Sequence, residues 1–176
     1  VRNARYIPDI VKEDSHSTCS QEELGSVFVH HFASLLGTSV KISPPSREVM
    51  DNGPRVLVDM FHGMLGPVTN EDIWEVVAGM NSNKAPGSDG YNALFFKKAW
   101  PVIGMDVCEV VKEFFSSGKL LMQVNHAFIA LVPKADNPTR VNHFRPISCY
   151  NLLYKIISKI LANRLVLVLD AIIDPA

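Results

Sequence analysis

Two short apolar runs separated by a polar turn constrain the fold of this chain more than any other feature of its sequence. The first occupies residues 126–133 and is followed by Lys134, while the second occupies residues 144–148 and contains Arg145. Apolar runs of this length are typical of strands, and the Asp-Asn-Pro sequence at 136–138 is typical of a turn. The simplest topology is a β-hairpin, in which we expect the first strand to be buried.

Most of the remaining sequence has the apolar periodicity of helices, so the expected fold class is α+β and helix-rich. Ser20 and Glu23 form a capping-box signature, and Thr69 with Asp72 forms a weaker one. Pro101 either kinks a long helix or begins a new one. The predicted helices cover residues 20–36, 56–65, 69–80, 92–117 and 152–168.

Polar segments suggest where the chain divides. Residues 1–19 have no apolar pattern, and we interpret them as a linker or ragged end. Residues 38–56 are rich in Ser, Pro, Gly and charge, which is typical of a loop. The sequence therefore predicts an N-terminal extension over 1–68, with one amphipathic helix at about 20–36, and a main domain over 69–176.

Charge is distributed unevenly along the chain, although its net value is only −1. Residues 1–83 contain 6 Lys or Arg against 11 Asp or Glu, whereas residues 84–176 contain 11 against 7. Residues 119–164 contain 7 basic side chains and a single acidic one, Asp136. A local excess of this kind favours binding of phosphate, and an ordinary solvated basic surface is the alternative.

Several classes of protein are disfavoured by the sequence. Its three cysteines are far apart and form no C-x-x-C pair, which argues for a reducing compartment, against a disulfide-linked partner and against a zinc site. The six histidines lack metal-ligand spacing, so no metal ligand is predicted in this chain. No apolar run is long enough to cross a bilayer, and we expect no membrane association.

Two further segments contain residues suited to binding a ligand. The loop at 84–90 reads Lys-Ala-Pro-Gly-Ser-Asp-Gly, and its glycines allow positive φ and close approach of the backbone to a ligand. It lacks the P-loop pattern, and a plain turn between helices is the alternative. On the last predicted helix, Lys155, Lys159 and Asn163 share one polar face at intervals of four residues. That face is either solvated or in contact with nucleic acid.

Together these segments resemble the fingers region of LINE-type (non-LTR) retroelement reverse transcriptases, especially their plant members. The family has a Lys-Ala-Pro-Gly-Pro-Asp-Gly loop, a Phe-Arg-Pro-Ile-Ser strand and a Tyr-Lys-Ile-Ile-Ser-Lys-Ile-Leu-Ala-Asn-Arg-Leu helix. This sequence matches all three, with Ser88 in place of the usual Pro and His143 in place of the usual Asp. The resemblance is strong over 69–176 and loose over 20–68. Group II intron maturases share the strands but fit the helix less well.

The resemblance implies roles for particular residues. Lys134 and Arg145 would bind the triphosphate of an incoming nucleotide. A second set would contact nucleic acid: Lys84, Gly87, Asp89, Gly90, Lys155, Lys159 and Arg164. The implied partners are an RNA template, a DNA primer and deoxynucleoside triphosphates (dNTP). The implied location is intracellular, at nuclear DNA, although the sequence has no strong basic import cluster.

The family's catalytic aspartates are expected in an aromatic-x-x-Asp strand and a Tyr-x-Asp-Asp hairpin. Neither motif occurs in this sequence, and Asp170 and Asp174 match neither, so no residue is assigned a catalytic role. We therefore expect an incomplete right-hand polymerase with a partial reverse transcriptase domain over 69–176. This fragment would need no cofactor, although Mg2+ is expected for the full-length parent. Whether the chain is an enzyme stays open, and the alternatives are a non-catalytic nucleic-acid-binding module and an inert remnant of a decayed element.

Overall fold

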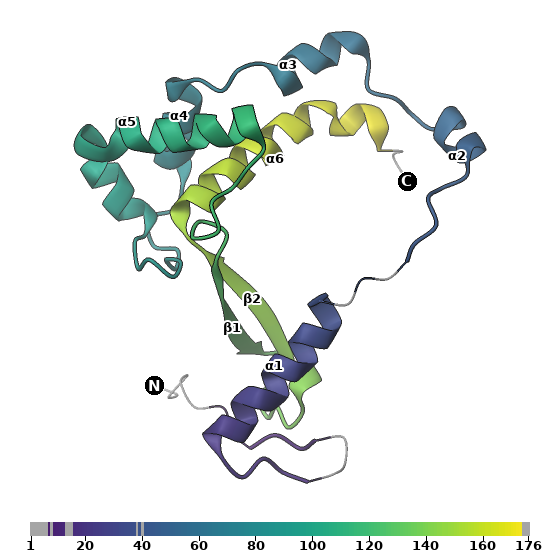
Figure 1. Ribbon diagram of the computed structural model, residues 1–176, viewed down its shortest axis with the longest axis vertical. Coiled ribbons are helices and arrows are strands. Elements are labelled where there is room, and N and C mark those ends of the chain that lie inside the picture. Colours follow the sequence, from purple (N-terminus) through teal and green to yellow (C-terminus); the bar gives the residue numbers. More distant parts are fainter. Residues whose placement is uncertain (1–6, 8, 13–15, 38, 40, 174–176) are drawn as a thin grey trace. The chain divides into compact units, whose positions relative to one another are not determined.

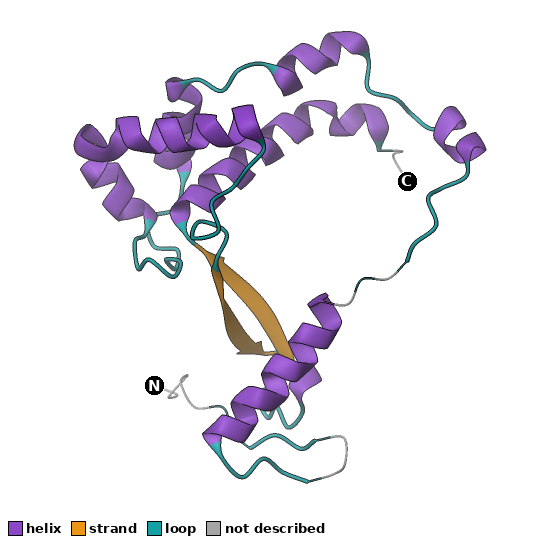
Figure 2. Cartoon of the chain, viewed as in Figure 1, coloured by secondary structure: helices purple, strands orange, loops and turns teal. Residues whose placement is uncertain are grey.

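The computed structural model describes residues 7, 9–12, 16–37, 39 and 41–173. Within these ranges the chain is rich in helix and has one two-stranded sheet (Figure 1 and Figure 2). It separates into two compact units, one made of Val1–Pro44 and Ile129–Ile147 and the other of Pro45–Phe128 and Ser148–Ala176. The chain therefore passes from one unit to the other before Pro45 and once within each strand.

The sheet is the predicted hairpin, and it is formed by β1 (Ala127–Pro133) and β2 (Phe144–Tyr150). The backbone N–H of Lys134 donates to the carbonyl oxygen of His143 at 2.8 Å, which joins the strands at the turn end. A short 3-10 helix, η2 (Val141–His143), leads into β2.

The expected burial of the first strand is wrong. Side chains on one face of β1 are open to solvent, with Phe128 63% and Val132 40% exposed. An isolated two-stranded sheet covers neither of its faces, so only the face against which a helix packs is removed from water. Leu131 and Phe144 lie on that covered face, as part of the apolar core of the first unit.

The core of the first unit is formed by α1 (Gln21–Gly37), which corresponds to the predicted amphipathic helix. Its buried residues Leu24, Phe28 and Phe32 are spaced for one helical face. The ring of Phe28 meets that of Phe144 edge to face, with 5.1 Å between the centroids. This geometry is favourable for aromatic pairs and holds the helix against the hairpin.

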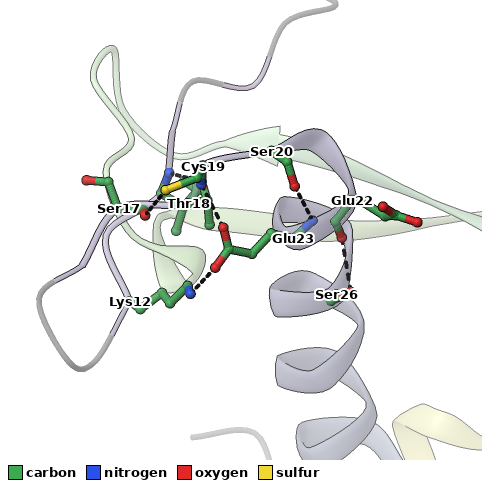
Figure 3. Close-up of polar contacts among 9 residues, drawn as sticks. Lys12, Ser17, Thr18, Cys19, Ser20, Glu22, Glu23 and Ser26 are labelled. Atoms are coloured by element: carbon green, nitrogen blue, oxygen red, sulfur yellow. Dashed lines mark hydrogen bonds and ion pairs between the residues drawn. The ribbon is translucent and has the colours of Figure 1, made fainter.

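The start of α1 is stabilised by hydrogen bonds that Figure 3 shows. The backbone N–H of Glu23 donates to Ser20 Oγ at 3.1 Å, as the capping-box signature predicts. The Glu23 carboxylate accepts the backbone N–H of Cys19 at 2.7 Å, one residue before the usual partner, and also contacts Lys12 Nζ. The helix therefore begins at a defined residue and is linked to the segment before it.

The described part of residues 1–19 is more ordered than a linker. Ile10 is fully buried in the core of the first unit, and its backbone N–H donates to Thr18 Oγ1 at 3.0 Å. The N–H of Val11 donates to the carbonyl oxygen of Thr139 at 2.8 Å. Interpretation of this stretch as a linker is therefore wrong for the described residues, because contacts with distant segments provide the order that the local pattern does not.

The core of the second unit lies between three helices, α4 (Asn70–Gly79), α5 (Ala93–Ser117) and α6 (Leu152–Ile172). Each begins at a side-chain cap, and Thr69 with Asp72 forms the full capping box. Helix α5 continues through Pro101 and ends at Gly118, whose φ of 69° suits glycine. Shorter elements precede these helices: α2 (Arg47–Asn52), η1 (Val58–Met60) and α3 (Phe61–Leu65).

Two of these details differ from the sequence-based prediction. Helix α2 lies in the stretch 38–56, where a loop was expected. The division into units also differs from the predicted boundary at residue 68, because residues 129–147 belong to the same unit as α1. The hairpin turn lies far from α1 in sequence, and no local pattern reveals that the two pack together.

Candidate nucleic-acid interface

The two cations predicted to bind a triphosphate lie near the turn end of the hairpin, in the first unit. Lys134 pairs with His143 through the backbone hydrogen bond between the strands. Since side chains alternate along a strand, Arg145 projects to the side of β2 opposite to Phe144, whose ring packs against α1. Both Lys134 and Arg145 are exposed. Both cations are therefore open to solvent near the turn end of the hairpin, and their joint binding of a triphosphate stays a prediction.

The two cations differ in their hydrogen bonds. Lys134 Nζ donates to the carbonyl oxygen of Asn142 at 2.7 Å, which uses one of its three donors. Among the residues that the structure describes, Arg145 has no hydrogen-bond or ion-pair partner for its guanidinium group. Its planar fork is free to make two parallel bonds with a phosphate, as arginine side chains commonly do.

In the second unit, the loop at 84–90 is shaped by its own residues. Asp89 Oδ1 accepts the backbone N–H of Tyr91 at 3.0 Å, and the N–H of Gly90 donates to the carbonyl oxygen of Gly87 at 3.2 Å. Gly90 has a φ of 76°, a conformation that glycine adopts without strain. The structure thus gives Asp89 and Gly90 a role in turning the backbone, while their contact with nucleic acid stays a prediction.

Gly87 is buried against the start of α6. A Cβ atom at this position would lie 2.3 Å from the backbone nitrogen of Asn151 and 2.4 Å from its Cα. The absence of a side chain therefore allows two backbones to touch, which is a packing function, while contact of Gly87 with nucleic acid stays a prediction.

Asn151 connects three segments of the second unit, and it was not among the residues predicted from the sequence. Its Oδ1 accepts the N–H of Tyr154 at 3.0 Å and caps α6, while its Nδ2 donates to the carbonyl oxygen of Val124 at 2.8 Å. The residue is 5% exposed, so both bonds are shielded from water. An Asn directly before an apolar helical stripe is a recognisable cap signal, but its bond to the turn near Val124 is a tertiary feature.

A cleft of about 730 Å³ lies beside this loop, between α4, the start of α5 and α6. Three of the predicted lysines, Lys84, Lys155 and Lys159, line it. Its apolar lining includes Val76 and Leu152, and Glu75 contributes an acidic group. The predicted polar face of the last helix therefore lines a cavity, together with a lysine from the loop.

The three lysines have different environments. Lys155 Nζ donates to the carbonyl oxygen of Ala85 at 2.8 Å and so holds the loop against α6. Within the described residues, neither Lys84 Nζ nor Lys159 Nζ has a hydrogen-bond or ion-pair partner. Lys155 therefore positions the loop, and its contact with nucleic acid stays a prediction, while Lys84 and Lys159 are available to an anionic ligand.

Arg164 does not line this cleft, because its side chain forms hydrogen bonds with the segment around the end of α3. Its Nη1 and Nη2 donate to the carbonyl oxygens of Met64 and Gly66 at 3.0 and 2.6 Å, which satisfies the end of α3. The guanidinium carbon also lies 5.3 Å from the centre of the Phe115 ring. The structure gives this arginine a structural role, and its predicted contact with nucleic acid gains no support from this geometry.

A second cavity, of about 690 Å³, follows α1 and β1 in the first unit, and its lining contains no charged side chain. No group of three or more His, Cys, Asp or Glu side chains in the described ranges is placed to hold a metal ion. Among the helices that the structure describes, none has the length and apolar character needed to cross a membrane.

Comparison with known proteins adds one relationship, while no family model matches the chain. Over 135 residues the chain is 32% identical to the uncharacterized 149 kDa protein of transposon TX1 from Xenopus laevis. The match covers 76% of this chain and 10% of that protein, so the chain spans about a tenth of its relative's length. The relative comes from Xenopus, and the plant assignment gains no support from it. The chain is thus related to a transposon-encoded protein, in agreement with the non-LTR retrotransposon origin that the sequence resemblance implies.

Proposed function

We propose that this chain is part of a non-LTR retrotransposon reverse transcriptase, in which it binds the phosphates of nucleic acid or nucleotide and does not polymerise by itself. The observation that carries the proposal is the exposure of both Lys134 and Arg145 near the turn end of the hairpin. The relationship to the transposon TX1 protein supports the same origin.

The physical basis is electrostatic. A positively charged surface attracts phosphate, and each phosphate contact releases condensed counterions. Arg145 supplies a bidentate donor and Lys134 a point charge, a combination suited to a triphosphate or to two successive backbone phosphates. In the proposed parent enzyme, an RNA template, a DNA primer, dNTP and Mg2+ would complete the reaction, with the metal ions assisting transfer of the nucleotidyl group.

Binding of a labelled single-stranded RNA oligonucleotide, measured by fluorescence anisotropy over a range of salt concentrations, tests the proposal. The double variant Lys134→Ala/Arg145→Ala should bind more weakly, and its salt slope should fall by about 0.7 for each phosphate that it no longer neutralises. Arg47→Ala is a matched control, because the Arg47 side chain is 92% exposed and belongs to neither the hairpin nor the lining of the cleft. Unchanged affinity after charge reversal at both Lys134 and Arg145 would refute the assignment.

Polymerisation is tested separately with the same protein. A primed RNA template, dNTP and Mg2+ should give no incorporation with the purified chain, whereas a full-length reverse transcriptase provides the positive control. Template-dependent and metal-dependent incorporation would overturn the second part of the proposal and would leave the binding assignment intact.

A further inference from the structure

We propose that the exposed aromatic pair Tyr91 and Phe95 in the second unit is a stacking platform for a base of single-stranded nucleic acid, whose phosphates bind Lys84 and Lys159 in the neighbouring cleft. The inference rests on the proposed function, since it specifies the form of nucleic acid that the chain binds. It assigns a function to two residues for which the sequence suggested none.

The two rings face each other at the surface. Their centroids are 4.3 Å apart at an interplanar angle of 30°, and Tyr91 and Phe95 are 49% and 41% exposed. Large aromatic side chains contribute to stability mainly when they are buried. A pair of tilted, closely packed rings that stays this exposed instead offers an apolar surface to a ligand.

The pair is held in place by rigid neighbours. Phe95 packs edge to face on Phe96, with 5.6 Å between centroids, and Phe96 belongs to the buried core of the second unit. Tyr91 is fixed through its backbone N–H, which donates to Asp89 Oδ1 at 3.0 Å. Asn92 caps α5 by accepting the N–H of Phe95 at 3.1 Å. The rings are therefore positioned before any ligand arrives, which reduces the entropy lost on binding.

The cleft begins next to this platform. Asn92 and Ala93, which follow Tyr91 directly, both line it, as do Lys84 and Lys159. Neither lysine side chain has a partner among the described residues, whereas Lys155 holds the loop that positions Lys84. Aromatic rings beside a cationic groove are the arrangement by which proteins bind single strands with little sequence preference.

A base-paired duplex does not fit this arrangement. Its bases are stacked on one another, and their faces are not available to a protein ring without unstacking. The proposed platform therefore predicts tighter binding of single strands than of duplexes. It also predicts that the bases and the phosphates contribute separately to the affinity.

The test measures binding of the full chain to three labelled ligands by fluorescence anisotropy: a single-stranded DNA oligonucleotide, an abasic oligomer of the same length and the corresponding duplex. Tyr91→Leu should weaken binding of the single strand by roughly 5- to 100-fold with an unchanged salt slope. The same variant should bind the abasic oligomer and the duplex as the unaltered chain does. Tyr91→Phe, which keeps the ring, should retain affinity for the single strand.

Two further variants complete the design. Lys84→Ala/Lys159→Ala should weaken binding of the single strand and of the abasic oligomer together, with a salt slope lower by about 0.7 for each phosphate that is no longer bound. Phe61→Leu is the matched aromatic control, since Phe61 is 40% exposed and does not line the cleft. Each variant is compared at a temperature well below its own melting midpoint, so that unfolding is not mistaken for weaker binding.

The outcomes separate this inference from the function on which it rests. If the single strand binds in a salt-dependent way that requires Lys134 and Arg145 but is unaffected by Tyr91→Leu, the platform is refuted and the proposed function stands. An equal loss of affinity for the abasic oligomer also refutes the platform. If the unaltered chain binds none of the three ligands, both proposals fail.

Discussion

Gly87 and Asn151 touch through their backbones, although they lie in a loop and at the start of a helix that are far apart in sequence. A Cβ atom on Gly87 would stand 2.3 Å from the nitrogen of Asn151, a distance that real Cβ contacts do not reach. Because the atoms it would meet belong to the backbone, neither partner can move aside by changing a rotamer. This contact fixes the loop that contains Lys84 and Asp89 against α6.

The first prediction is that Gly87→Ala destabilises the protein. The added methyl group overpacks the contact with Asn151, at a cost of about 1–3 kcal/mol in the free energy of unfolding. Thermal and urea denaturation followed by circular dichroism measure the change. Gly79→Ala is the control, since a Cβ atom at Gly79 meets nothing within 4 Å and should leave stability unchanged or raise it. Equal stability of the Gly87 variant and the unaltered chain would contradict this close packing.

The second prediction separates the two functions of Asn151. Asn151→Asp keeps an oxygen that caps α6 but replaces the Nδ2 group that donates to the carbonyl oxygen of Val124, so it should destabilise by roughly 1–3 kcal/mol. Asn151→Ala also removes the cap and should cost about 1 kcal/mol more. Urea denaturation of both variants gives the comparison. The tertiary bond has no energetic importance if the Asp variant is as stable as the unaltered chain.

The third prediction concerns Arg164. Arg164→Ala leaves the carbonyl oxygens of Met64 and Gly66 without these donors and removes the interaction with the Phe115 ring, so it should destabilise by about 2–4 kcal/mol. Lys159→Ala, on an exposed turn of the same helix, should change stability by less than about 0.5 kcal/mol. For affinity toward nucleic acid we expect the reverse order, with a larger loss for Lys159→Ala than for Arg164→Ala. A stable Arg164→Ala variant with a reduced salt slope would support the contact with nucleic acid that the sequence suggested.

The fourth prediction concerns the cysteines. Burial raises the pKa of the Cys108 thiol above its ordinary value of 9.0, and Glu71 adds to this effect while Lys112 opposes it. The protonated thiol is unreactive, so a thiol reagent at pH 8 should modify exposed Cys19 rapidly and Cys108 only after unfolding. A Cys19→Ser variant identifies the fast phase. Rapid modification of Cys108 without denaturant would show that the core around α5 opens readily.

The same shift in pKa predicts a dependence of stability on pH. Because the folded state binds the Cys108 proton more tightly than the unfolded state, this group's contribution is fully present below pH 9.0 and is lost as the pH rises toward the folded pKa. Cys108→Ala should remove that alkaline component while the remaining pH dependence persists. Urea midpoints between about pH 7 and pH 10, a range that spans the ordinary thiol pKa, provide the measurement.

Local patterns predicted most of the elements. The sequence predicts three features that depend on residues close in sequence. They are the capping pair Thr69 and Asp72, the apolar stripe of α6 and the turn of the hairpin. The shared polar face of Lys155 and Lys159 followed from helical periodicity in the same way, whereas the cleft that both line was not predicted.

What the sequence did not reveal depends on contacts between distant segments. The burial of Ile10, the exposure of β1 and the bonds of Arg164 to the end of α3 are set by which surfaces meet, and one chain's periodicity does not encode that. The exposure of Tyr91 and Phe95 is not predictable from the sequence for a related reason. An aromatic residue at helical spacing is most often part of a core, and only the packed structure shows which ones remain outside it.

The division of the first unit between two stretches of sequence has a consequence for synthesis of the chain. Helix α1 packs on Leu131 and Phe144, which the ribosome adds more than a hundred residues after Phe28. At about 5–20 residues per second, α1 waits on the order of ten seconds for these partners. During that interval its apolar face is open to chaperones and to other nascent chains. Slower elongation between α1 and the hairpin would lengthen the interval in which this face is exposed.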